Sequence, residues 1–147
     1  MGIFNFFKKK STLLEDIKKS SNWMIKCMNY SGYNVDMSIE SLKEVERFFC
    51  EQMDDETHIP IPGGLLSESI GSKIFAIGSL VGEIILKERG GQWITNDKDR
   101  EGEINIMVQL LNGTCIFPVQ RVMKRCAEGT ENNIYHYAVS TTKPICR

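Results

Sequence analysis

The stretch from Ile70 to Arg125 constrains the fold of this chain more than any other part of the sequence. It contains a long apolar segment, a Gly-Gly-Gln-Trp motif, an Asn-Gly dipeptide between two apolar runs, and a segment rich in basic residues. In the apolar segment, hydrophobic residues recur at the spacing of an α-helix, and Gly90 and Gly91 stand where helices commonly end. This order predicts a long helix, an antiparallel hairpin and a second helix.

The predicted long helix extends from about Ser67 to Arg89. Its apolar side consists of Ile70, Ile74, Ile77, Val81 and Ile84, and a stripe of small and polar residues consists of Ser72, Ala76, Ser79, Glu83 and Lys87. Gly71, Gly78 and Gly82 lie between these two sides. A glycine in a helix interior costs up to about 1 kcal/mol, so three on one flank predict that another backbone packs closely there.

The Asn112-Gly113 dipeptide predicts a hairpin. Both residues tolerate positive φ, which suits a two-residue type I′ turn between strands at 104–111 and 114–117. That turn would place Leu110 opposite Cys115, which fixes the register of the whole pair. One face of the sheet would then carry Ile104, Ile106, Val108, Leu110, Cys115 and Phe117, and the second, mixed face would carry Met107, Leu111 and Ile116. A further strand is expected at 92–95.

Two helices are expected before the long one. Thr12 and Glu15 form a capping-box pattern ahead of the first, which spans about Leu13 to Asn29. Ser38 is expected to cap the second. The inner side of that helix consists of Leu42, Val45, Phe49 and Met53. A loop with two prolines and two glycines at 57–64 separates it from the long helix.

After the hairpin, Pro118 suits the first position of a helix that ends at Gly129. Its inward side is expected to be Val119, Val122, Met123 and Cys126, and its outward side Arg121, Lys124 and Arg125. Residues 134–139 fit either an edge strand or another helical turn. The chain of 147 residues is therefore expected to form one α+β domain at 11–147, with a small antiparallel sheet of three or four strands, behind a segment at 1–10.

The order Gly-Gly-Gln-Trp, hairpin, Phe-Pro-Val and Lys-Arg also resembles a known pattern. It follows the segment from Ile74 to Glu83, in which glycines recur along a helix. The combination resembles a group of small bacterial domains of unknown function, in which a helix ends before a tryptophan and a hairpin leads through a Phe-Pro or Ile-Pro step into a basic helix. The resemblance covers roughly the C-terminal half of the chain and implies no particular activity.

Charge and cysteine usage exclude some classes of function. The formal net charge of −1 argues against a large phosphate-binding surface, so no nucleic-acid partner is expected. Five cysteines without a Cys-x-x-Cys pair, and no secretory signal, predict reduced thiols in a cytoplasmic protein. The apolar run from Ile74 to Leu86 is too short to span a bilayer.

The first ten residues allow a peripheral contact with a membrane. Their apolar and basic members are Ile3, Phe4, Phe6, Phe7, Lys8, Lys9 and Lys10. Aromatic residues followed by lysines suit an anionic membrane surface. The same residues could instead dock on this domain or on a partner protein.

No motif in the sequence predicts a catalytic centre, a cofactor or a metal site. Gly71-Ser72-Lys73 lacks the residue order of a phosphate-binding loop, and Gly78-Ser79 lies inside a helix, unlike a nucleophile elbow. His58 and His136 lack the spacing of zinc ligands. The acidic residues at 54–56 could gather with His58 around a cation but are expected to be solvated.

Glu83 is the best candidate for a general acid or base. A carboxylate beside glycines on a buried helix could have a raised pKa, as such a role requires. The simpler expectation is an ion pair with Lys87, four residues further along the same helix. The sequence leaves both interpretations open.

Elimination favours a non-catalytic domain that binds another protein, of the adaptor or toxin-neutralising type. The predicted contact residues come from the second sheet face and the basic helix: Met107, Leu111, Ile116, Arg121, Lys124 and Arg125. One alternative is a peripheral membrane protein anchored by residues 3–10, and another is an enzyme that uses Glu83. A homodimer is also open, because the glycine flank could pack against a second copy.

Overall fold

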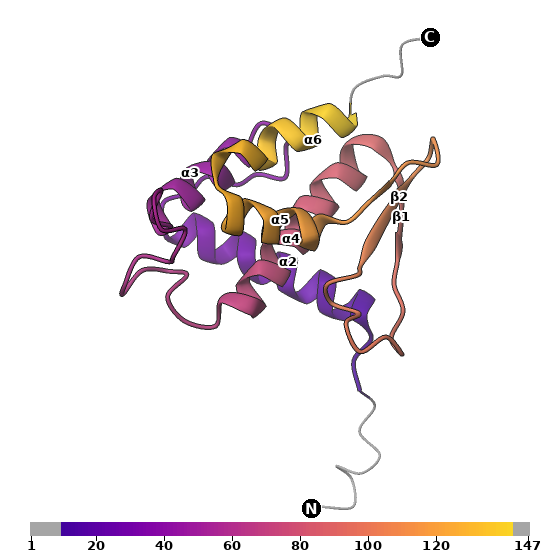
Figure 1. The fold of residues 1–147 in the computed structure, drawn as a ribbon. Helices are drawn as coiled ribbons and strands as arrows, with labels where there is room; N and C mark the ends of the chain where they lie inside the picture. The colour runs from indigo at the N-terminus through magenta and orange to yellow at the C-terminus, as the bar shows by residue number, and fades with distance from the viewer. Residues whose placement is uncertain (1–9, 143–147) are drawn as a thin grey trace, which may run out of the picture.

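The computed structural model describes residues 10–142 of the chain (Figure 1). Its helices and strands are α2 (Leu13–Tyr30), α3 (Leu42–Gln52), α4 (Ile70–Arg89), β1 (Gly91–Ile94), β2 (Met107–Leu110), β3 (Cys115–Ile116), α5 (Pro118–Glu128), the 3₁₀-helix η1 (Thr130–Asn132) and α6 (Ile134–Thr142). The predicted α+β class is confirmed. Residues 134–139, which fit either a strand or a helix by sequence, belong to α6.

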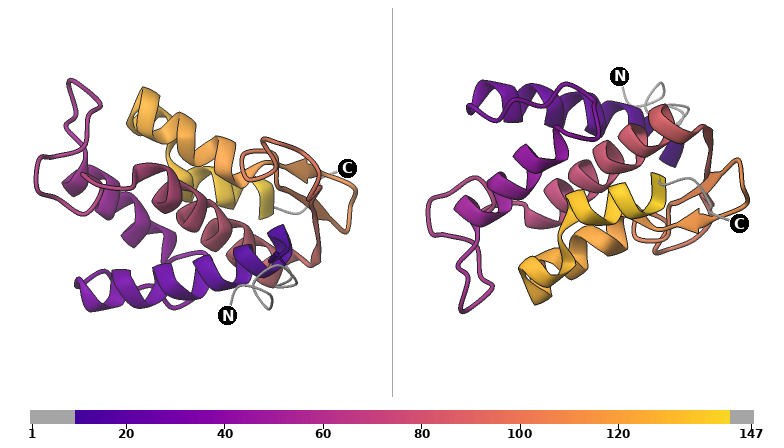
Figure 2. Two further views of the ribbon diagram at one scale, coloured as in Figure 1. Left: turned by 90° about the horizontal axis from the view of Figure 1, so that it is seen from below. Right: turned by 90° about the horizontal axis from the view of Figure 1, so that it is seen from above.

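Helix α4 is the central element of the fold. It lies between α2 on one side and α5 with α6 on the other, and the sheet adjoins its C-terminal end (Figure 2). Residues 75–82 of α4 are all buried, because neighbours cover this part of the helix from every direction. This explains why α4 is apolar almost all round, and why Ser79 of the predicted polar stripe is buried.

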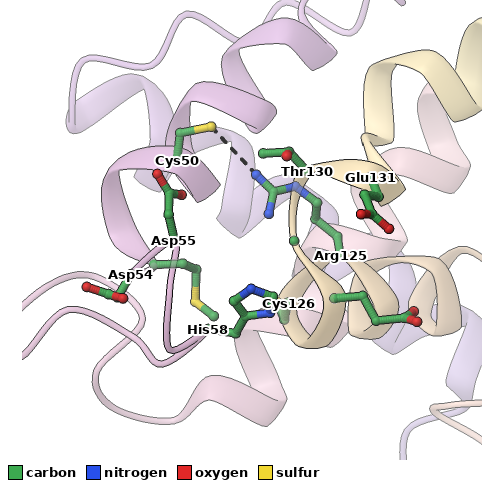
Figure 3. A pocket seen from close by; sticks show the side chains of 11 residues that line it. Cys50, Asp54, Asp55, His58, Arg125, Cys126, Thr130 and Glu131 are labelled. Carbon is green, nitrogen blue, oxygen red and sulfur yellow. Dashed lines mark hydrogen bonds between the residues drawn. The ribbon is translucent and has the colours of Figure 1, made fainter.

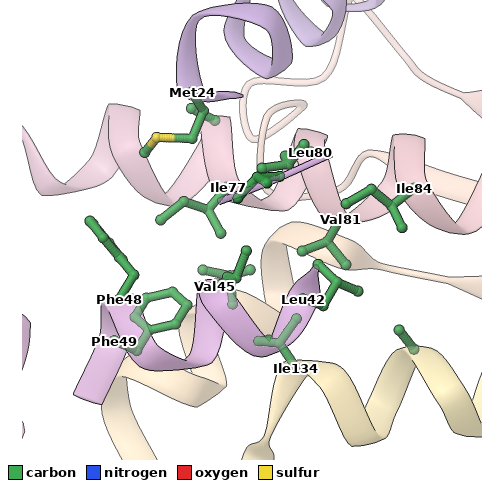
Figure 4. Packing of buried hydrophobic residues seen from close by; sticks show 14 of the residues in the cluster. Met24, Leu42, Val45, Phe48, Phe49, Ile77, Leu80, Val81, Ile84 and Ile134 are labelled. Carbon is green, nitrogen blue, oxygen red and sulfur yellow. The ribbon is translucent and has the colours of Figure 1, made fainter. Parts of the chain in front are cut away.

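The main hydrophobic core forms where α4 meets α3 and α6. Val45 and Phe49 of α3 pack with Ile77 and Val81 of α4, and Ile134 of α6 closes the cluster (Figure 4). The apolar residues predicted for the inner side of α3 are all buried. Burial of this kind contributes about 25 cal/mol per Å² of apolar surface removed from water, so these contacts are a main source of the fold's stability.

The three glycines of α4 have different surroundings. A Cβ atom on Gly78 would lie 2.8 Å from the Cα of Val119, so this glycine allows the start of α5 to approach α4 closely. A Cβ on Gly82 would collide with the indole ring of Trp93, which follows in β1. Gly71 faces open space. The predicted close approach of a second backbone is therefore confirmed at Gly78, whereas Gly82 accommodates a side chain.

The hairpin exists, but its predicted register is wrong. Strand β1 pairs with β2, and β2 with β3, all antiparallel, and Val108 lies opposite Ile116 instead of Phe117. The backbone N–H of Leu110 donates to the carbonyl of Thr114 at 2.8 Å, which closes a three-residue loop at 111–113. Only Gly113 in this loop has positive φ. The one-residue shift turns Ile116 inward and leaves Cys115 and Phe117 exposed.

Helix α3 begins three residues later than a cap at Ser38 would place it. Its first residue is Leu42, and Ser41 occupies the N-cap position. The hydroxyl of Ser38 accepts a hydrogen bond from the backbone N–H of Ser41 at 3.1 Å. Ser38 therefore shapes the turn that leads into α3, while at α2 the predicted cap is confirmed, since the Thr12 hydroxyl accepts from the N–H of Glu15.

The predicted membrane segment falls almost entirely outside the described residues. Of its members, Ile3, Phe4, Phe6, Phe7, Lys8 and Lys9 lie outside them, and Lys10 is exposed. Within residues 10–142, no helix is both long enough and apolar enough to cross a bilayer.

Candidate functional site

An apolar groove lies along the exposed side of α2. Its volume is about 190 Å³, and it is lined by Trp23, Met24, Cys27, Met28, Tyr30, Ser31, Phe48, Leu65 and Lys73. We call this set the apolar groove. The exposed fractions of its rim residues are 48% for Trp23, 95% for Tyr30 and 42% for Leu65. Large apolar side chains that stay exposed together are typical of surfaces that bind other molecules.

The two faces of α2 explain how the groove arises. Ile17, Met24 and Met28 recur at helical spacing and are buried toward the interior. Trp23 and Tyr30 lie on the adjoining side of the helix, two turns apart. Packing against α4 therefore occupies one face of α2 and leaves a second face, with two aromatic rings, uncovered by the described residues.

The opposite wall of the groove is fixed by hydrogen bonds from neighbouring elements. The side-chain oxygen of Gln52 accepts from the N–H of Leu65 at 2.7 Å. Lys73 donates from Nζ to the carbonyl of Leu65 at 2.6 Å. The last residue of α3 and the first turn of α4 thus both hold Leu65 in place, and the groove is formed before any partner binds.

A larger, more polar hollow lies between the end of α3 and the end of α5. This polar pocket has a volume of about 460 Å³ and is lined by Cys50, Met53, Asp54, Asp55, His58, Arg125, Cys126, Glu128, Gly129, Thr130 and Glu131 (Figure 3). Its residues come from α3, the loop that follows it, α5 and η1. It is the place where a catalytic or metal site would be sought first.

Arg125, which lines the polar pocket, forms a buried ion pair with Glu46 behind it. Nε of Arg125 donates to both oxygens of Glu46, at 2.9 and 3.2 Å, and Arg125 is only 3% exposed. Glu46 also accepts from the backbone N–H of Ile134 at 2.7 Å. We call Glu46, Arg125 and Ile134 the polar junction, because these groups join α3, α5 and α6. Arg125 was expected on the outward side of its helix, and the structure corrects this orientation.

His58 and Cys50 of the polar pocket each contact a group on α5. The Nδ1 atom of His58 lies 2.7 Å from the carbonyl of Ala127, and Nη2 of Arg125 donates to Sγ of Cys50 at 3.6 Å. Burial raises the pKa of the Cys126 thiol to about 11, so this thiol carries little nucleophilic thiolate at neutral pH. Within residues 10–142, no cluster of three His, Cys, Asp or Glu side chains could hold a metal ion.

The two basic residues of α5 that do face outward line a separate hollow. Arg121 and Lys124 lie there with Phe117 and Tyr137, in a volume of about 350 Å³. The guanidinium of Arg121 stands 4.3 Å from the ring centroid of Tyr137 and donates to Asn132 at 3.2 Å. Arg121 is therefore half-buried against α6, whereas Lys124 is exposed.

The residues predicted on the second sheet face do not form one surface. Leu111 is 81% exposed at the tip of the hairpin, and Met107 is half-buried. Ile116 is 5% exposed, so its predicted outward orientation is wrong, because the hairpin register differs by one residue. Of the six predicted contact residues, burial therefore removes Ile116 and Arg125 from the accessible surface, and a role of the others in binding stays a prediction.

Glu83 is engaged by partners from other elements. Its carboxylate pairs with Nζ of Lys18 on α2 at 2.7 Å, and Nε1 of Trp93 donates to it at 3.4 Å. Lys87, the partner expected from sequence, is exposed one turn further along α4. The Glu83 side chain is 15% exposed and does not line the polar pocket.

Sequence reasoning did not single out Trp23, Tyr30 or Glu46. A signal existed for the first two, since both aromatic residues fall off the apolar side defined by Ile17 and Met24. No comparable signal marks Glu46, because its partner Arg125 lies 79 positions away in the sequence.

Residues 64–137 match the family model described as Domain of unknown function (DUF3806). The match includes Leu65 and Lys73 of the apolar groove and all elements from α4 to η1, and it excludes α2 and α3. Comparison with curated proteins and with solved structures finds no match.

Proposed function

The chain belongs to the DUF3806 family of domains of unknown function, and from that premise we propose that it is a non-catalytic, protein-binding domain of the adaptor or toxin-neutralising type. The observation that carries the proposal is the apolar groove, with Trp23 and Tyr30 exposed beside an anchored Leu65. Aromatic side chains are enriched in the centres of protein interfaces, where they supply large contact area at low cost in conformational entropy. The proposed binding surface is thus α2, not the sheet.

The groove suits a protein better than a small molecule. Its volume of about 190 Å³ is below the range of about 300–1,000 Å³ that is common for small-molecule sites, and its rim residues point to solvent instead of enclosing a cavity. A protein partner would cover the exposed rings from outside, as an interface does. The apolar lining and the rigid wall both favour this mode of binding.

The candidates for catalysis support the same conclusion. Glu83 is ion-paired with Lys18, and the Cys126 thiol has a raised pKa. His58 is held against Ala127 by its ring nitrogen. Each of these groups has a structural role that accounts for its position.

Site-specific photo-crosslinking in cells of the native host tests the proposal. A photoreactive phenylalanine analogue replaces Tyr30 in one variant and Leu111 in a second, since both positions are highly exposed. We expect one protein to crosslink from position 30 at near-stoichiometric yield and not from position 111, with the product identified by mass spectrometry. Crosslinking from neither position, or equally from both, would rule out the groove as the binding surface.

A further inference from the structure

We propose that the apolar groove receives an amphipathic α-helix of the partner, whose apolar stripe is flanked by acidic side chains. This inference rests on the proposed function, because it names the kind of segment that a protein partner would present. It is carried by the shape of the groove, the spacing of its rim residues and the charge of its surroundings.

The walls of the groove favour a helix over an extended strand. They come from α2, α3, the segment around Leu65 and the first turn of α4, and include no strand whose edge could pair with an extended peptide. Along α2, the exposed Trp23 and Tyr30 and the half-buried Cys27 between them are four and three residues apart. This spacing is the seam along which one helix packs on another, and the small Cys27 at its centre lets a second backbone approach.

The length of the seam sets the length of the contact. Trp23 and Tyr30 are separated by two helical turns, or about 10 Å along the axis. A partner helix would span this distance with apolar residues at positions i, i+4 and i+7. Phe48, Met24 and Met28 are buried at the floor of the groove. The three apolar residues of the partner helix would therefore contact a packed apolar surface.

Two lysines, Lys73 and Lys26, lie at the groove. Lys73 is the one titratable cation among the lining residues, and Lys26 is the one charged residue between Trp23 and Tyr30. Lys73 lies on the first turn of α4, where no side-chain cap offsets the partial positive charge of the helix N-terminus. A second copy of this chain would bring the same lysines, which would repel, whereas acidic residues beside an apolar stripe would be attracted.

Binding of synthetic helices to the full chain tests this inference. The probe is a fluorescein-labelled, stapled peptide of 16 residues with leucines at i, i+4 and i+7 and glutamates beside them, on an alanine background. Matched peptides carry glutamine or lysine in place of glutamate, and a scrambled peptide distributes its leucines around the helix. Fluorescence anisotropy should show binding about fivefold weaker for glutamine, more than tenfold weaker for lysine, and no saturation for the scrambled peptide.

Variants of the protein locate the binding. Trp23→Ala should weaken binding of the acidic peptide about tenfold or more, and Ile59→Ala should leave it unchanged. Ile59 is a suitable control because its side chain is 60% exposed and does not line the groove. Lys26→Glu should weaken the acidic peptide and strengthen the lysine peptide. Equal affinity for the acidic and basic peptides, or binding that Trp23→Ala leaves intact, would overturn the inference.

The two proposals fail in different ways. If a protein crosslinks from position 30 but the acidic peptide does not compete with it, the inference is wrong and the proposed function stands. If the acidic peptide competes and Lys26→Glu abolishes the competition, the inference is supported. If no protein crosslinks and no peptide binds, both are overturned.

Discussion

The polar junction buries charged side chains, whereas the apolar groove exposes aromatic ones. Each is the reverse of the usual placement in a folded domain. At the junction, a glutamate and an arginine are almost fully buried, with Arg125 only 3% exposed. At the groove, a tryptophan and a tyrosine lie at the surface, with Tyr30 95% exposed. Buried charges and clustered exposed aromatic rings are both uncommon in soluble domains, so each region calls for a physical reason.

This contrast indicates that the polar junction stabilises the fold and that the apolar groove is available for binding. The carboxylate of Glu46 on α3 accepts hydrogen bonds from Arg125 on α5 and from the N–H of Ile134 on α6. This one carboxylate therefore connects three helices. The rings of Trp23 and Tyr30 contribute little comparable contact, since much of their surface stays in water. Changes at the junction should therefore act on stability, and changes at the groove on binding.

The largest effect is expected from breaking the polar junction. Arg125→Met leaves Glu46 buried without its cation, which should lower the free energy of unfolding by about 3–5 kcal/mol. Urea denaturation followed by circular dichroism measures this change. Lys124→Met, on the exposed side of the same helix, is the matched control and should change stability by less than about 0.5 kcal/mol.

The double variant Glu46→Gln/Arg125→Met separates charge from packing. It removes both charges and leaves an amide that can still accept from Ile134, so it should recover part of the loss. A double variant as unstable as Arg125→Met alone would show that the lost packing of the arginine, not the unpaired carboxylate, dominates.

A second, smaller effect is expected where α5 meets α4. Gly78→Ala would place a methyl group 2.8 Å from the Cα of Val119, and α5 would have to move away, at a cost of about 1–3 kcal/mol. Gly71→Ala, on the same helix in open space, should instead stabilise by about 0.5–1 kcal/mol. Thermal melts of the two variants should shift in opposite directions. Equal shifts would mean that helix propensity, and not the approach of α5, decides both.

Acid should weaken α3 through the carboxylates of Glu44 and Glu51, both of which are ion-paired with Arg47. Hydrogen bonds from Arg47 lower the pKa of Glu44, and those from Tyr33 and then Arg47 lower the pKa of Glu51, both from an ordinary value of 4.5. The stability they contribute is present above pH 4.5 and is lost as the pH falls through their lowered values. Urea midpoints measured between pH 6 and pH 3 should decline, and the decline should be shallower in Glu44→Gln/Glu51→Gln. An unchanged slope would assign the acid sensitivity to other carboxylates.

The smallest effect on stability is expected at the groove. Trp23→Ala should change the free energy of unfolding by less than about 1 kcal/mol, and Tyr30→Ser by less than about 0.5 kcal/mol, because both side chains are substantially exposed in the native state. Urea denaturation gives these values under the conditions used for Arg125→Met. A loss at Trp23 as large as that at Arg125 would remove the contrast between the two regions.

The sequence predicts the helices and strands better than the orientation of side chains between them. The long helix and its stop at Gly90 follow from local signals that the structure retains. The hairpin register does not, because Asn112-Gly113 fits both a two-residue turn and the three-residue loop that forms. Packing of Ile116 beside β2 selects between them, and no local pattern reports that packing.

The same limit applies to the candidate site. Arg125 follows two outward basic residues on α5, so helical spacing alone places it toward solvent. The burial of this arginine depends on Glu46, which reaches it from a different helix. Hydrophobic periodicity describes one helix or strand at a time. It therefore does not predict pairs between distant elements, such as Glu83 with Lys18.

The two tryptophans of the chain give each region its own optical signal. The indole of Trp93 lies over Gly82 and donates to Glu83, so its emission should respond when the sheet separates from α4. Trp23 emits from the rim of the groove, where a quencher such as iodide reaches the exposed half of the side chain until a partner covers it. In Trp93→Phe the remaining fluorescence would report occupancy of the groove, and in Trp23→Phe it would report unfolding, without any added label.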